Sequence, residues 1–246
     1  MEGGLIVRDI ILIICVAALL LPMEAGVSGA AEPELTLPGP GGSPADIDRE
    51  VLWLDNPDYE GQGMTSEVIG EYDIESEFAN DFFLEQPATI RKVTWWGVYW
   101  NGYEGTPTGT GFNLRFYYDN GNCLPEELPF LEFLLPGDIC CERYFEGGDQ
   151  FSQYTYEFCL ELDLAAGSCW FSAQMADHAF PPQWGRLSGY VIRLCESAFR
   201  SAYFSYPDWV PGHEICTCDA SQMFEDVCEP TAVESASWGA VKALYR

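Results

Sequence analysis

The chain has 246 residues, of which 39 are acidic and 11 are basic, and its net charge at neutral pH is −28. A surface so acidic repels nucleic acid and anionic membranes, and two lysines, Lys92 and Lys242, are too few to build a polybasic patch. We therefore expect no nucleic-acid partner, and we interpret the acid excess as a source of solubility rather than as a dedicated cation site.

Residues 1–30 have the pattern of an export signal. Arg8 precedes the apolar run 10–21, Pro22 interrupts the run, and the small residues 28–30 follow it. The run is shorter than the ~20 apolar residues that a membrane-spanning helix needs, so we prefer a cleaved signal peptide to a membrane anchor. The expected product is a secreted or cell-surface protein with no membrane span in its mature chain.

The composition then divides the mature chain into four parts. Residues 31–50 are rich in proline, glycine and acidic residues and lack an apolar period, which predicts a flexible linker. Residues 51–210 have the size of one β-sandwich domain. A cysteine-rich extension at 211–230 and a C-terminal tail at 231–246 follow.

Nine cysteines lie beyond the signal, and in an exported chain they are most simply disulfide partners. An odd number leaves at least one unpaired within the molecule. His213 and Glu214 precede Cys216 and Cys218, but this group lacks a second ligand pair at the spacing of a zinc finger, so we expect no metal there. The nine are Cys123, Cys140, Cys141, Cys159, Cys169, Cys195, Cys216, Cys218 and Cys228.

The segment Ile90–Trp100, IRKVTWWGVYW, is dense in aromatic and β-branched side chains, which favours a strand. Its alternation sends Val93, Trp95 and Tyr99 to one face and bulky residues such as Trp96 to the other. Both faces therefore need cover, so we expect a central strand between two layers.

Two further segments alternate along their length. Phe112–Tyr118 predicts a half-buried strand, and the polar, glycine-containing run 119–122 after it predicts a tight turn. Gln153–Asp163 and Ser168–Met175, joined by a short turn, predict a hairpin. Their alternation places Cys159 outward and Cys169 inward, which disfavours a disulfide between these two.

Shorter strands are expected at Phe78–Leu84, Gly189–Leu194 and Ser201–Ser205, and no normal amphipathic helix appears between residues 51 and 210. Many short strands and turns predict an all-β, antiparallel β-sandwich of jelly-roll type, with a barrel as the alternative.

A resemblance supports the sandwich. Asn80-Asp81-Phe82, then VTWWGVYW, FYYDNGN, LAAGSCWFSAQM and Phe180-Pro181-Pro182-Gln183-Trp184-Gly185 together resemble a family of uncharacterised secreted bacterial β-sandwich domains. The resemblance covers residues 51–205 and implies a jelly-roll architecture similar to that of carbohydrate-binding domains. The family carries no assigned catalytic residues, so it implies no activity.

The tail, TAVESASWGAVKALYR, resembles short terminal segments that recur on unrelated exported bacterial proteins. That resemblance implies a sorting or attachment tag. Trp238, Val241 and Leu244 also share one helical face, which predicts a helix that docks on the sandwich. Both interpretations remain open.

No catalytic residue can be named from the sequence, because the two histidines lie far apart and neither accompanies a nucleophile motif. We expect a protein that is not an enzyme. Acidic residues cluster between positions 67 and 81, and we interpret them as a solvated loop, with a structural Ca²⁺ site as the alternative. The cluster comprises Glu67, Glu71, Asp73, Glu75, Glu77 and Asp81.

The large rings Trp96, Trp100, Tyr103 and Trp184 are the candidate ligand-binding residues, since sugars stack on exposed flat rings. Two functions follow from these patterns. The first is a non-catalytic extracellular or cell-surface protein with a structural or adhesive sandwich that contacts other surface proteins. The second is a carbohydrate-binding module or a degenerate glycan-active enzyme. Exposed rings beside carboxylates would favour the second, and a closed aromatic core would favour the first.

Overall fold

The computed structural model describes residues 50–59, 63–100, 111–136, 141–145, 152–176, 179–180, 183–190, 194–215 and 219–228. The chain divides into two units, Met1–Ala45 and Asp46–Arg246, and every described residue belongs to the second. Among the described residues, helical turns are limited to the 3-10 elements η1 (Gly70–Tyr72) and η2 (Gly212–Glu214). No helix of the described ranges has the length and apolarity to cross a membrane.

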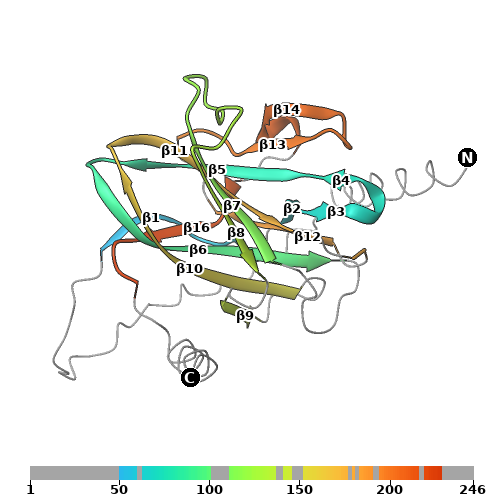
Figure 1. Ribbon diagram of the computed structural model, residues 1–246, viewed down its shortest axis with the longest axis horizontal. Coiled ribbons are helices and arrows are strands. Elements are labelled where there is room, and N and C mark those ends of the chain that lie inside the picture. The colour runs from blue at the N-terminus through green and yellow to red at the C-terminus, as the bar shows by residue number, and fades with distance from the viewer. Residues whose placement is uncertain are drawn as a thin grey trace, which may run out of the picture. The chain divides into compact units, whose positions relative to one another are not determined.

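Two antiparallel sheets form the two layers of the fold (Figure 1). In the first sheet the strand order is β1-β16-β6-β10-β9, and β12 joins β6 and also pairs with β2 and β15. The strands of this sheet are β1 (Val51–Asp55), β2 (Gly63–Thr65), β6 (Ala88–Trp100), β9 (Cys141–Phe145), β10 (Ser152–Leu164), β12 (Gln183–Gly189), β15 (Asp219–Ala220) and β16 (Gln222–Glu225).

The second sheet has the order β14-β13-β5-β11-β7-β8, and a two-stranded ribbon of β3 and β4 precedes β5 in the chain. The predicted all-β, antiparallel, jelly-roll-like sandwich is thereby confirmed. The strands of the second sheet and the ribbon are β3 (Val68–Ile69), β4 (Ile74–Glu75), β5 (Glu77–Leu84), β7 (Gly111–Tyr118), β8 (Leu131–Pro136), β11 (Gly167–Met175), β13 (Ala198–Ser201) and β14 (Tyr206–Pro211).

Strand β6 is the central strand that its composition predicted. It pairs with β10 along one edge and with β16 and then β12 along the other. Val93, Trp95 and Tyr99 are buried in the core between the sheets, and Trp96 and Val98 on the opposite face are buried as well. Covering both faces is what allows two adjacent tryptophans to lie in one strand without exposing either.

Gly97 explains how β12 can approach β6 so closely. A Cβ atom at this position would collide with the indole of Trp184, which lies on β12 beside it. The glycine in the middle of an otherwise bulky strand therefore provides the space that a neighbouring side chain fills.

The predicted hairpin of β10 and β11 is wrong. The two strands belong to different sheets: β10 pairs with β6, and β11 pairs with β5 and β7. Leu164 lies opposite Ala88 and Gly167 lies opposite Leu84, so the β5–β6 and β10–β11 connections cross between the sheets side by side. Alternation of side chains sets which face of a strand is buried, but it does not select the partner strand.

The segment predicted as a cysteine-rich extension at 211–230 supplies two strands of the sandwich itself. β16 lies between β1 and β6, and Phe224 on it is fully buried. A disulfide joins Cys228, just beyond β16, to Cys159 on β10. The domain therefore extends past residue 210, because its first sheet is completed by strands from both ends of the described chain.

Two of the shorter strand predictions are displaced. β12 ends at Gly189, and Tyr190 and Leu194 beyond it are exposed. β13 ends at Ser201, where residues 202–205 turn the chain into β14. Tyr190 and Leu194 lie in exposed bends, and residues 202–205 form a turn, so the aromatic and aliphatic residues at these positions are not part of a strand.

Candidate functional site

Two of the four aromatic residues expected to bind ligand, Trp184 and Trp96, are buried. Trp184 is fully buried, and its indole N–H donates to the Tyr156 hydroxyl at 3.1 Å. Trp96 is 8% exposed and packs with Val98 and Leu187. Neither ring can present a face to a sugar, so a stacking role does not fit these two residues. The side chain of Trp100 and all of Tyr103 lie outside the described residues.

The interpretation of the acidic cluster as a solvated loop is wrong for half of its members. Glu67, Glu77 and Asp81 are buried, whereas Glu71 and Asp73 are exposed. Buried carboxylates are stable only with partners, and these three have different ones. No group of three or more histidine, cysteine or acidic side chains in the described part of the chain is arranged to hold a metal ion.

Glu67 connects the ribbon strands to β12. Its Oε2 accepts the backbone N–H of Trp184 at 2.7 Å, and its Oε1 accepts the Thr65 hydroxyl at 2.9 Å. This carboxylate therefore completes the hydrogen bonding of β12 at the strand's start.

Glu77 is the centre of a charged network on the outer face of the second sheet. Its carboxylate accepts bonds from Arg200 at 2.6 Å and from the Tyr117 hydroxyl at 2.6 Å, and Arg115 lies 3.1 Å away. Burial alone would raise its pKa, but Arg115 and Arg200 outweigh burial and hold the pKa of Glu77 below its ordinary value. Arg200 also lies over the Trp209 ring at 4.5 Å.

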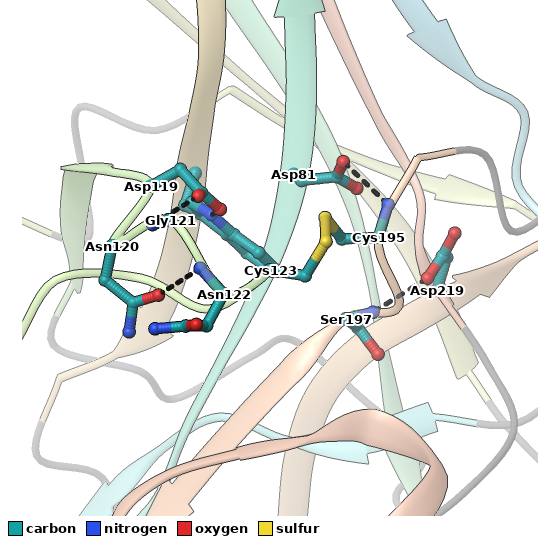
Figure 2. Close-up of a disulfide and its surroundings, with 10 residues drawn as sticks. Asp81, Asp119, Asn120, Gly121, Asn122, Cys123, Cys195, Ser197 and Asp219 are labelled. Carbon is teal, nitrogen blue, oxygen red and sulfur yellow. Dashed lines mark hydrogen bonds between the residues drawn. A yellow bond between two sulfur atoms is a disulfide. The ribbon is translucent and has the colours of Figure 1, made fainter.

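Asp81 lies on the same outer face, at the corner closed by the Cys123–Cys195 disulfide (Figure 2). Its Oδ2 accepts the backbone N–H of Cys195 at 3.1 Å. Burial, reinforced by repulsion from Asp55 and Asp119, raises the pKa of Asp81 to about 7. Near neutral pH this carboxyl group is therefore partly protonated.

The loop that carries Cys123 is the tight turn expected after β7. Asp119 Oδ1 accepts the N–H of Gly121 at 2.7 Å, and Asn120 Oδ1 accepts the N–H of Asn122 at 2.9 Å (Figure 2). Gly121 has a φ of 85°, which glycine tolerates without strain. These two side-chain oxygens satisfy the loop's own backbone, and Asp119 Oδ2 accepts the Trp170 indole N–H at 3.0 Å, so the corner has a structural role.

The described histidine, His213, contacts the exposed carboxylate of Glu196 at the surface. The other histidine, His178, and the pair Cys216 and Cys218 lie outside the described residues. The metal site considered near His213 therefore has no described geometry.

A groove of about 490 Å³ lies on the surface of the described part of the chain. It lies at the end of the sandwich where β5 crosses to β6, and residues 50–54 and 83–88 line it. Most of these side chains are apolar, and Phe83 is 37% exposed. Glu50 and Glu85 are the charged members, and they give the groove an acidic rim.

Hydrogen bonds fix the position of β1 along this groove. Trp53 donates its indole N–H to Asp55 Oδ2 at 2.6 Å, and Asn80 on β5 donates to the same oxygen at 3.2 Å. β1 is an edge strand among the described strands, since the order of the first sheet begins with it. One wall of the groove is therefore a strand edge.

Sequence reasoning missed this groove. The signal that could have indicated it is Val51-Leu-Trp-Leu-Asp, a short apolar run directly after the proline-rich linker, which was not assigned as a strand. Nothing in the local pattern indicates that it lies next to residues 83–88.

Comparisons with protein-family models, with curated proteins and with solved structures find no match to this chain. The resemblance to a secreted bacterial sandwich family therefore remains a prediction from sequence. Two described cysteine pairs at disulfide distance, Cys123–Cys195 and Cys159–Cys228, point to an oxidising environment.

Proposed function

We propose that the protein is a non-catalytic extracellular or cell-surface protein whose β-sandwich has a structural or adhesive role. The observation that supports this proposal best is the placement of its large rings. Trp95 and Trp184 are buried between the sheets, Trp170 and Trp96 are buried in smaller clusters on the outer faces, and none of the four rings presents a face to a ligand. A closed aromatic core favours a scaffold over a stacking platform for sugars.

The covalent framework also supports this role. Cys123–Cys195 and Cys159–Cys228 close loops with sequence separations of 72 and 69 residues. In the chain-entropy model, crosslinks of such long loops each stabilise a domain by roughly 4 kcal/mol. A sandwich held in this way suits a protein that must persist outside the cell, in the oxidising compartment that its export signal predicts.

A glycan-array screen of the purified mature protein, from residue 31 to 246, tests the proposal against the carbohydrate-binding alternative. We expect no specific retention. Trp96→Ala and Trp184→Ala should lower the melting temperature, because each opens a cavity in the core. Specific glycan retention that either substitution abolishes, with the melting temperature unchanged, would overturn the proposal.

Export is tested separately, by N-terminal sequencing of the protein recovered from outside an expressing bacterial cell. We expect a mature terminus near Ala31. Recovery of the chain in the cytoplasm with Met1 retained would contradict an extracellular role.

A further inference from the structure

The groove beside β1 has a composition that selects its occupant. Its lining includes the exposed apolar side chains of Val51 and Phe83, its charged residues are Glu50 and Glu85, and none of the residues that line it is basic. Such a surface favours a segment with apolar side chains and a positive charge over an acidic segment.

The described chain ends next to this groove. Asp226, just after β16, donates its backbone N–H to the Glu50 carbonyl at 3.2 Å and accepts the Glu50 N–H on its side chain at 2.9 Å. Two residues later, Cys228 is joined to Cys159. These bonds fix the point from which the remaining residues 229–246 depart, beside a residue that itself lines the groove.

Residues 231–246 have the composition that the groove calls for. They contain Trp238, Val241 and Leu244, they end in a segment with Lys242 and Arg246, and Glu234 is their one acidic residue. Ten residues separate Cys228 from Trp238, and ten extended residues span up to ~35 Å, which exceeds the length of the five-residue strand β1.

We propose that residues 231–246 dock in the groove formed by residues 50–54 and 83–88 of the same molecule. The apolar side chains of the tail cover Phe83 and its neighbours, and Lys242 and Arg246 lie toward the Glu85 rim. Tethering beside the groove gives the tail an effective concentration in the millimolar range, so a weak intrinsic affinity is enough for occupancy. This inference is independent of the proposed structural or adhesive function.

A peptide-binding experiment tests the docking. The mature protein truncated after Pro230 is titrated into a fluorescently labelled synthetic peptide of residues 231–246, and anisotropy is measured. We expect saturable binding that weakens at 1 M salt, because exposed charge pairs are screened there. The untruncated protein should bind the peptide at least tenfold more weakly, since its own tail occupies the groove.

Matched variants locate the site. Glu85→Lys reverses the charge of the rim at an exposed position, and it should weaken peptide binding about tenfold without changing the melting temperature. Asp208→Lys makes the same charge change at an exposed position on β14 of the other sheet, and it should leave binding within about twofold of the truncated parent. A peptide with Trp238 and Leu244 replaced by serine should not bind.

Three results would overturn the proposal. The first is no saturable binding by the truncated protein at 1 mM. The second is equal loss with Glu85→Lys and Asp208→Lys, which would indicate general charge attraction. The third is equal peptide binding by the truncated and untruncated proteins, which would leave the tail accessible as an address or available to a second copy.

Discussion

The core between the sheets and the Glu77 network on the outer face of the second sheet both bury side chains, but they differ in chemistry. Between the sheets, Trp95 stacks on Tyr156 with ring centroids 5.5 Å apart and meets Phe112 edge-on at 5.2 Å. On the outer face, the buried side chains around Glu77 are charged or hydroxylated and are joined by hydrogen bonds.

The two regions depend on different physics. Apolar burial is non-directional and scales with area, so the rings of the core tolerate small adjustments as long as volume is conserved. A buried carboxylate repays its desolvation only if every partner is in place. The geometry of the outer-face network is therefore more tightly specified than that of the core. Changing the type of a single atom in it is enough to disrupt its hydrogen bonds and ion pairs. The following experiments test this difference.

Trp95→Ala should have the largest effect. Emptying a fully buried aromatic site costs about 3 to 5 kcal/mol, a large part of the ~5 to 15 kcal/mol by which domains are stable. Urea denaturation of the purified protein measures the loss. Tyr190→Ala, at a ring that is 62% exposed, is the control and should change stability little. Equal losses would remove the distinction between core and surface.

Glu77→Gln should cost about 3 kcal/mol, because it keeps the shape of the side chain but leaves Arg200 without its counter-charge and Arg115 with only the half-exposed Glu132. The control is Glu161→Gln, which breaks the exposed pair of Glu161 and Arg91 at 3.9 Å and should cost less than about 1 kcal/mol. If Glu77→Gln lowers the stability no more than the control does, the outer-face network is dispensable. Burial of apolar area would then account for the stability of both regions.

Asp81→Asn should remove a pH dependence. The folded pKa of Asp81 is about 7, above its ordinary value of 3.8, so the folded state binds its proton more tightly than the unfolded chain. The stability from this proton is complete below about pH 4 and is lost as the pH rises through about 7. We expect the asparagine variant to match the parent near pH 4 and to exceed it by about 4 kcal/mol at pH 8, since each unit of pKa shift corresponds to ~1.4 kcal/mol. A constant difference between the two across this range would contradict the shifted titration.

Cys169 gives the smallest effect, a difference in reactivity. This thiol is buried on β11 and free, and burial together with Asp119 raises its pKa to about 11. The thiolate is the reactive form, so alkylation in the folded state should be slow and should accelerate on unfolding. Peptide mapping after iodoacetamide treatment, with and without urea, measures the extent of alkylation at Cys169. Rapid labelling of the folded protein would show that the inner face opens readily.

The sequence by itself determined the elements whose pattern is strong and local. The aromatic, β-branched run at 90–100 predicted the central strand, alternation predicted β7, β10 and the core face of β11, and the polar turn after Tyr118 followed from its asparagines and glycine. The same alternation placed Cys159 outward and Cys169 inward, as observed. These features depend on residues that are close in sequence. Hydrophobic periodicity and strand propensity are properties of such short segments, so they predict these features.

Tertiary structure decided the pairing of the strands and, with it, the candidate site. Residues 222–225 complete the first sheet, β10 and β11 separate into different sheets, and β1 meets residues 83–88 to form the groove. The same long-range packing buries Trp184 beside Gly97 and draws Glu77 and Asp81 out of solvent. The pattern of a segment indicates which of its side chains should be buried. Which other segment buries them depends on the free energy of the whole chain, and the sequence of one segment does not contain that information.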